Sequence, residues 1–218
     1  QLFWQEARTA ERRTIHPFPL RSPTLGVLFR LPEVVSVESG NSLVVPIVNR
    51  EVPARRVALY QPATHATHPL AAVRVKNDGP SGLPPGVLTI YERAAKSGAV
   101  AYVGDAQLTT LPAGEERLVS FALDQKTKID RTVKRRQTLA KGSVNRGVFK
   151  RTVIDRQTTT YRLKAPAREG RTVLVEHPRR KGWKLVSPGG DDVALTKDTY
   201  RMEVKLDKGA KEVFEVVM

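Results

Sequence analysis

Residues 83–124 read LPPGVLTIYERAAKSGAVAYVGDAQLTTLPAGEERLVSFALD, and this stretch predicts several short strands joined by turns. Residues 86–91 are an apolar, β-rich run after a Pro-Pro turn, and residues 99–103 are a second run that Gly104 ends. Residues 117–123 then alternate apolar and polar side chains. A period of two, interrupted by Gly and Pro, is typical of half-buried strands.

The same pattern continues on both sides of this stretch. Apolar runs recur at intervals on the order of ten residues, with turn residues between them, which is typical of a sandwich or barrel. No helical crossover separates the runs, so the sequence predicts an all-β fold of antiparallel β-sandwich type. A short helix is expected at most in residues 1–13. The other predicted strands are residues 25–31, 34–37, 43–48, 57–60, 71–75, 144–154, 158–163, 172–176, 183–186, 200–206 and 213–217.

The chain divides loosely near Lys126. Residues 1–23 are expected to be a connection, either a plain linker or the end of a helical or coiled-coil segment. Residues 24–125 form a first β part and residues 126–218 a second one with long basic strands; these are either two sandwiches or one continuous domain. No apolar run is long enough to span a membrane. No signal peptide is visible and no Met begins the chain, so we expect that an upstream segment has been removed.

The charge of the chain is high and uneven. The formal net charge is +15, from 37 Lys and Arg against 22 Asp and Glu. Residues 1–120 hold 13 basic and 10 acidic residues, whereas residues 121–218 hold 24 and 12. A positive field of this kind attracts nucleic acid, anionic lipid, acidic polysaccharide or an acidic protein surface, and the charge alone does not choose among them.

The basic excess is densest between Lys126 and Arg156, which makes this segment the best candidate site. It either binds an anionic polymer or a membrane surface, or is a solvated strand pair surrounded by counterions. Nucleic acid is disfavoured, because proteins that bind single strands stack bases on aromatic side chains and the segment holds only Phe149. The candidate anion-binding residues are Lys134, Arg135, Arg136, Lys141, Arg146, Lys150 and Arg151.

No other group of residues predicts a reactive site. The chain has no cysteine, which excludes disulfides, thiol nucleophiles and cysteine-bound zinc. His65 and His68 meet only if their segment is a turn or a helix, and a polar loop is the simpler interpretation. His177 is expected at the rim of a strand, and Trp183 and Tyr161 in the core. We therefore predict no catalytic, metal-binding or cofactor-binding residue, and no enzymatic activity.

The order and spacing of the strand segments resemble a known family. They are similar to the C-terminal domain, of unknown function, of mucoidy-inhibitor-like proteins. The segments that carry the resemblance are SLVVPIVNREVPA (42–54), RVALYQP (56–62), LAAVRVKN (70–77), LPPGVLTIYE (83–92), AYVGDAQL (101–108), LPAGEERLVSFALD (111–124), TTYRLKA (159–165), RTVLVEHP (171–178), GWKLVSP (182–188) and TYRMEVKL (199–206).

This resemblance implies a β-sandwich module of an exported or envelope-associated bacterial protein, located outside the cytoplasm. Such proteins carry a β domain and a coiled coil ahead of this domain, and the family offers no catalytic residues to transfer. The expected partners are another protein or a second copy of the chain. Residues 126–156 are richer in Lys and Arg than the family pattern, so a surface partner shared with the family is not inferred for this segment. The alternative function is binding of an anionic polymer or lipid head groups through residues 126–156.

Overall fold

A computed structural model of the chain describes residues 34–44, 46, 50–94, 97–190 and 193–218. Within them the chain forms β-strands and no helix, which confirms the predicted all-β fold. The predictions for residues 1–23 and for a strand at 25–31 lie outside the described residues. The strands are β1 (Ala54–Tyr60), β2 (Leu70–Lys76), β3 (Gly86–Arg93), β4 (Val100–Leu108), β5 (Glu116–Leu123), β6 (Lys128–Asn145), β7 (Val148–Lys164), β8 (Arg171–Pro178), β9 (Val193–Leu195), β10 (Thr199–Leu206) and β11 (Lys211–Val217).

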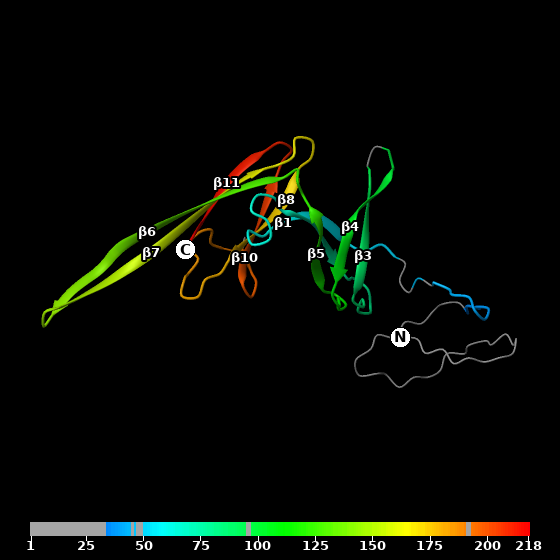
Figure 1. Cartoon of the computed structure of the whole chain (residues 1–218), viewed down its shortest axis with the longest axis horizontal. Coiled ribbons are helices and arrows are strands. Elements are labelled where there is room, and N and C mark those ends of the chain that lie inside the picture. Colours follow the sequence, from blue (N-terminus) through cyan, green and yellow to red (C-terminus); the bar gives the residue numbers. More distant parts are fainter. Residues whose placement is uncertain (1–33, 45, 47–49, 95–96, 191–192) are drawn as a thin grey trace, which may run out of the picture.

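The strands make three sheets, as Figure 1 shows. The largest has the order β5-β2-β1-β8-β10-β9, a second has the order β11-β7-β6, and β3 pairs with β4 alone. The pairing is antiparallel except between β1 and β8, which run parallel. The prediction of purely antiparallel sheets is therefore wrong at this pair. A parallel pair requires a long crossover connection, and strands β2 to β7 provide it here in place of a helix.

One face of the six-stranded sheet is covered by both smaller sheets. The register places Ala58, Tyr60 and Val73 on this face, because side chains of paired residues point the same way. Ala58 and Tyr60 pack against buried residues of β6, β7 and β11. Val73 packs instead against the apolar side of β3 and β4. The two small sheets therefore lie next to each other on one large sheet, and β6 and β7 start inside the first of these cores.

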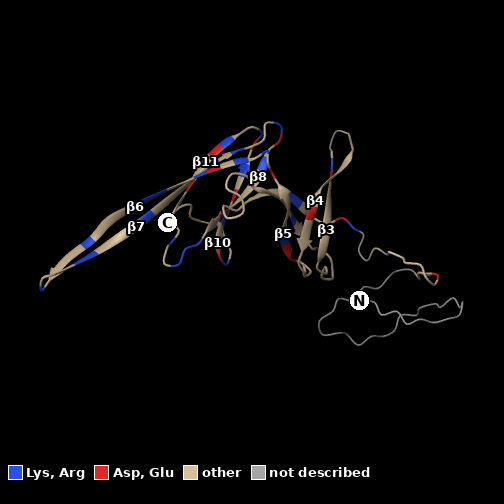
Figure 2. Cartoon of the chain, viewed as in Figure 1, with Lys and Arg blue, Asp and Glu red and all other residues tan. Residues whose placement is uncertain are grey.

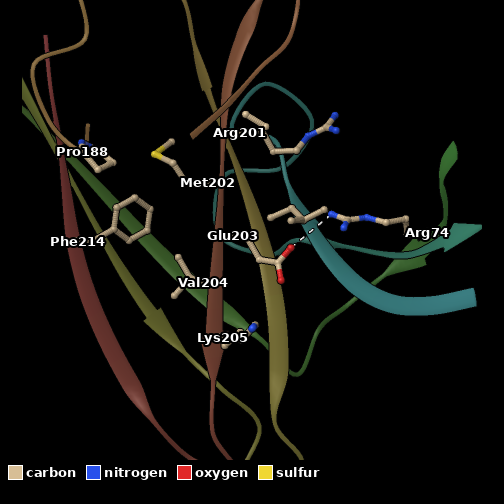
Figure 3. Close-up of a pocket in the computed structure, with 10 residues that line it drawn as sticks. Arg74, Pro188, Arg201, Met202, Glu203, Val204, Lys205 and Phe214 are labelled. Atoms are coloured by element: carbon tan, nitrogen blue, oxygen red, sulfur yellow. Dashed lines mark hydrogen bonds and ion pairs between the residues drawn. The ribbon is translucent and has the colours of Figure 1, made fainter. Parts of the chain in front are cut away.

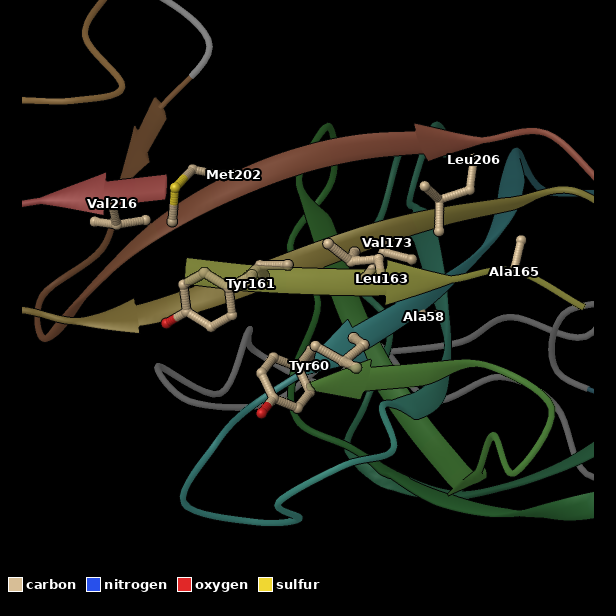
Figure 4. Packing of buried hydrophobic residues seen from close by; sticks show 11 residues of the cluster. Ala58, Tyr60, Tyr161, Leu163, Ala165, Val173, Met202, Leu206 and Val216 are labelled. Carbon is tan, nitrogen blue, oxygen red and sulfur yellow. The ribbon is translucent and has the colours of Figure 1, made fainter. Parts of the chain in front are cut away.

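Tyr161 lies at the centre of the larger core, which Figure 4 shows. Its ring meets Tyr60 edge to face, with centroids 6.1 Å apart, and stacks on Phe214 at 5.1 Å. Ile129 and Leu163, which are direct partners on β6 and β7, are also fully buried. Aromatic rings of this size bury large apolar areas, so the predicted core position of Tyr161 is confirmed.

Strand β4 does not end at Gly104, as the sequence predicted, but runs on to Leu108. Its pairing with β3 shifts by one residue between Ile90 and Tyr91, which is a bulge. Gly104 has a φ of +149°, and a Cβ at this position would lie 2.5 Å from the carbonyl oxygen of Phe121. The glycine therefore allows close approach of β4 to β5, and does not terminate the strand.

Several predicted strands are absent from the described part of the chain. Residues 34–37, and 43, 44 and 46 of the run 43–48, form no strand, and Val44 is 94% exposed. Residues 183–186 form a loop in which Trp183, predicted as a core residue, is only half-buried, with the Arg180 guanidinium 5.1 Å from its ring. Residues 34–37, 43, 44 and 46 have no strand partner among the described residues. Residues 183–186 reach β11 only at their end, where the Val186 N–H donates to the Val217 carbonyl oxygen and Ser187 forms an isolated bridge with Val217.

Candidate functional site

Strands β6 and β7 extend far beyond the core as a two-stranded hairpin (Figure 1). β11 pairs with β7 only as far as Thr158, and the last backbone hydrogen bonds on this edge join Gln157 to Met218. Beyond that point residues 136–156, which we call the arm, pair only with each other among the described residues. Nine residues of β7 at roughly 3.3 Å each make the arm about 30 Å long. The sequence predicted one strand across residues 144–154, which is wrong because the chain reverses within it.

The reversal is a tight turn between Asn145 and Val148. Arg146 and Gly147, the two central residues, have positive φ angles of 48° and 77°. Positive φ at both central positions matches the right-handed twist of a hairpin. Glycine adopts this conformation without strain, whereas Arg146 is the only non-glycine residue with positive φ among the described residues. The turn therefore places one guanidinium group at the far end of the arm.

The two faces of the hairpin differ in character. One face, the basic face, carries five cations and no acidic side chain over this part of the ribbon, and Figure 2 shows the basic positions along both strands. The opposite face carries apolar side chains together with Arg135, Arg151 and Asp155, of which Asp155 accepts a hydrogen bond from Gln137. The cations of the basic face are Lys134, Arg136, Lys141, Lys150 and Arg156, and this face also carries Val148 and Ile154; the apolar side chains opposite are Leu139, Val144, Phe149 and Val153.

A bulge at Ala140 places Lys141 on this basic face. Leu139 pairs with Val153, but Lys141 pairs with Thr152, so Ala140 has no partner. A shift of one residue moves each following side chain to the other face of a strand. Without the bulge, Lys141 would lie on the same side as Leu139. The bulge therefore brings Lys141 to the face that holds Arg136, whereas Lys150 lies on this face because it is six residues from Arg156 along β7.

The structure thus places all seven predicted anion-binding residues on or at the base of one hairpin. It divides them between the surfaces of that hairpin. Four lie on the basic face, two on the opposite face, and Arg146 lies at the turn. The period of two separates Lys134 and Arg136 from Arg135, and Lys150 from Arg151, but the sequence could not show the face of Lys141, because the bulge has no Gly or Pro to mark it.

Arg136 and Arg156 are direct cross-strand partners on the basic face. Directly opposed side chains on one face have Cβ atoms about 4.5–5.5 Å apart, and like charges in this position destabilise a sheet. Both side chains are exposed, and neither forms a salt bridge within the described residues. The pair therefore opposes folding slightly and offers two guanidinium groups to one anion.

A buried Tyr–His pair lies where the hairpin leaves the core. The Tyr161 hydroxyl lies 2.7 Å from Nδ1 of His177, which is 1% exposed, so the prediction of a rim position for His177 is wrong. Nε2 of His177 is buried and has no hydrogen-bond partner among the described residues. Burial lowers the pKa of His177 to about 4, and the charges of Arg131 and Arg180 act in the same direction. Burial raises the pKa of Tyr161 to about 12, although Arg131 opposes this shift.

The low pKa of His177 predicts a loss of stability in mild acid. Between pH 6.5 and pH 4 the unfolded state binds a proton at His177 that the folded state does not, so the free energy of unfolding falls as the pH falls. A shift from 6.5 to about 4 corresponds to roughly 3 kcal/mol. Denaturant unfolding of the wild type and of His177→Gln across this window measures the effect. We expect a flatter pH dependence in the variant; parallel curves would contradict the assignment.

An open groove of about 690 Å³ lies along β10, and Figure 3 shows its lining. Glu203 is the only carboxylate among the described residues that line it, and it contacts Arg55 and Arg74 at 3.5 Å each. Arg201 binds Glu176 from β8 through Nη2 at 2.6 Å. These charged groups are paired with one another across β1, β2, β8 and β10, and their contacts stabilise the large sheet.

The loop between β1 and β2 brings His65 and His68 together, with ring centroids 5.3 Å apart. Nδ1 of His65 accepts hydrogen bonds from the backbone N–H groups of Thr67 and His68. Nδ1 of His68 lies 2.8 Å from the carbonyl oxygen of Thr127. These contacts hold the loop against the start of β6. In the described part of the chain, no group of three or more His, Asp or Glu side chains is arranged to hold a metal ion.

No family model, curated protein or solved structure matches the chain significantly. The resemblance to mucoidy-inhibitor-like proteins therefore stays a prediction. Among the described residues, none belongs to a helix with the length and hydropathy of a membrane span.

Proposed function

We propose that this chain is a non-enzymatic β-sandwich module that binds an anionic partner through the basic face of its arm. The observation that carries this proposal is the opposed pair Arg136 and Arg156. A like-charged pair across a free ribbon costs stability, and sequences keep such local conflicts mainly where function requires them. An anion bound between the two guanidinium groups removes the repulsion and accepts hydrogen bonds from both.

The surroundings of this pair favour a partner with many negative charges. Residues 134–156 contain eight Lys and Arg and one acidic residue, Asp155. The basic positions repeat along the ribbon on one face, so they match a row or a surface of anionic groups better than a single small anion. The arm extends these charges beyond the body, where the acidic residues of the described chain other than Asp155 lie (Figure 2).

The charge of the arm also disfavours pairing between two copies of the chain. The outer edge of β6 is open along the arm and could in principle pair with another strand. A second β6 would bring a second set of Lys and Arg beside the first, and like charges on neighbouring strands destabilise the sheet. A partner of opposite charge is therefore favoured over self-association at this edge. The family resemblance supports an exported or envelope-associated bacterial setting, which cell fractionation of the full-length protein can test.

Binding to a heparin-type column in a salt gradient tests the proposed function. The variant Lys134→Gln/Arg136→Gln/Arg156→Gln removes three charges from the basic face. It should elute at clearly lower salt than the wild type, because each lost contact reduces counterion release. Its unfolding free energy should stay unchanged or rise, since the opposed arginines are gone.

A matched control removes the same charge from the body. Lys76→Gln/Lys197→Gln/Lys208→Gln changes three exposed lysines of the body, none of them in the arm. If this control and the arm variant elute at the same salt concentration, net charge alone governs retention and the arm is not the binding site.

A further inference from the structure

Three large apolar side chains lie in the last two residue pairs before the turn of the arm. Counted back from the turn, the first pair of residues is Asn145 with Val148 and the second is Val144 with Phe149. Val144, Val148 and Phe149 are 72%, 56% and 62% exposed. Single exposed apolar residues are common on protein surfaces, but here Val144 and Phe149 share one face and Val148 lies on the other, so both faces of a highly charged ribbon are apolar next to the turn.

The next three pairs each bring a cation. Ser143 pairs with Lys150, Gly142 with Arg151, and Lys141 with Thr152. Lys141 and Lys150 lie on the basic face and Arg151 lies on the other, so cations surround the ribbon directly behind the apolar tip. At roughly 3.3 Å per residue, the apolar tip is about 7 Å deep and the basic zone behind it covers about the next 10 Å.

We propose that the tip of the arm inserts into the head-group region of a bilayer that contains anionic lipids. This inference rests on the proposed function and specifies its partner. Apolar faces of peripheral segments enter the boundary between head groups and acyl chains by about 5–10 Å, with Lys and Arg at the level of the phosphates. The depth of the apolar tip and the position of Lys141, Lys150 and Arg151 match these two levels.

The other charged and polar groups of the tip are compatible with this depth. Arg146 has a long aliphatic stem, which allows its guanidinium group to reach back to the phosphates. Backbone groups on the open edges of β6 and β7 need water or polar head groups, because an open edge is not tolerated inside hydrocarbon. Insertion is therefore limited to the interface, and the arm does not cross the bilayer.

A lipid surface explains features that other partners do not. A soluble polyanion would contact the cations but would leave Val144, Val148 and Phe149 in water. A second copy of the arm would bring cation against cation. An anionic bilayer binds the basic zone and also buries the apolar tip, and each cation near such a surface strengthens binding by about fivefold.

Vesicle sedimentation of the whole chain tests this inference. We expect binding to vesicles of phosphatidylglycerol and phosphatidylcholine, and none to phosphatidylcholine alone. Val144→Ser/Phe149→Ser keeps every charge and should weaken vesicle binding at least tenfold, while its retention on the heparin-type column stays that of the wild type. Both side chains are exposed, so the fold should tolerate the change, and an unchanged melting temperature checks this.

The lack of cysteine permits a second, direct measurement. Val148→Cys creates a single thiol for an environment-sensitive fluorophore such as NBD. Its emission should shift to the blue and brighten with anionic vesicles, whereas a label at Thr109→Cys, an exposed position on the body, should not respond. A response at both positions, or at neither, would overturn the insertion of the tip.

The outcomes separate the two proposals. Retention on the heparin-type column without vesicle binding overturns the lipid inference and leaves the proposed function standing, with a soluble polyanion as the partner. Equal vesicle binding by Val144→Ser/Phe149→Ser and the wild type also overturns insertion, because charge alone would then explain binding. If the wild type neither binds vesicles nor is retained on the heparin-type column, the proposed function itself is refuted.

Discussion

Replacing Asp124 with Ala is expected to lower the free energy of unfolding by about 3–5 kcal/mol, the usual cost of leaving a buried charge without its partner. Asp124 Oδ2 accepts a hydrogen bond from Nε of Arg171 at 3.0 Å, and both side chains are only 6% exposed. Oδ2 also accepts from the Thr127 hydroxyl, and Oδ1 accepts from the backbone N–H of Lys126. The substitution leaves the Arg171 guanidinium buried with Glu169 as its remaining partner.

The same carboxylate connects the arm to the sheets. Asp124 lies between β5 and β6, and Arg171 begins β8, so the ion pair fixes the start of the hairpin to the large sheet. Burial alone would raise the pKa of Asp124, but the hydrogen bonds from Thr127 and Arg171 and the charge of Arg171 hold the pKa below its usual range. The stability from this ionised group is therefore present at neutral pH and is lost as the pH falls through that depressed pKa.

Asp130→Ala is the matched control for Asp124→Ala. Asp130 is exposed on β6, and its ion pair with Lys128 lies in solvent, where such pairs contribute little. Its removal should change the free energy of unfolding by less than about 1 kcal/mol. Denaturant titrations of the three proteins at neutral pH make the comparison, and equal losses in the two variants would refute a special role for Asp124.

Tyr161→Ala is expected to cost about 3–5 kcal/mol, as large-to-small substitutions of buried aromatic residues do. The ring is fully buried between Tyr60 and Phe214, and the space it leaves lies between the two packed sheets. The hydroxyl contributes separately, because it is the partner of His177 Nδ1. Tyr161→Phe removes only the hydroxyl and should cost about 1–3 kcal/mol.

Tyr102→Ala provides the comparison for Tyr161→Ala. Tyr102 is exposed on β4 and forms an edge-to-face pair with Tyr91 at 6.0 Å. Its loss should cost about 1 kcal/mol, in the range of a single cross-strand pair. Thermal or denaturant unfolding measures all three variants. A loss for Tyr161→Ala no larger than that for Tyr102→Ala would show that the core does not depend on this ring.

The sequence predicted those parts of the fold that depend on local periodicity. The runs at residues 57–60, 71–75, 117–123, 200–206 and 213–217 all lie in strands, because one side of each is apolar and packs on a sheet. Such local patterns predict where strands lie along the chain. They contain no information on which strands become neighbours, so the parallel pair of β1 and β8 could not be foreseen.

The candidate site was predicted in composition but not in geometry. The density of Lys and Arg marked residues 126–156, and the structure places them on one hairpin. The face on which Lys141 lies depends on the unpaired residue Ala140, for which the sequence holds no signal. His177 was misassigned because a histidine before a proline is typical of a strand end, whereas its burial depends on Tyr161 and on the sheet packed above it.

The direct continuation of the arm into the core has a mechanical consequence. No linker separates the two, since β6 and β7 each run without interruption from buried Ile129 and Leu163 to the turn. A pull or torque on the tip is therefore transmitted as shear along one hydrogen-bonded ladder into the body. A partner bound at the tip, as we propose, would therefore be joined to the body by one continuous two-stranded ladder with a bulge at Ala140, and not by an irregular linker.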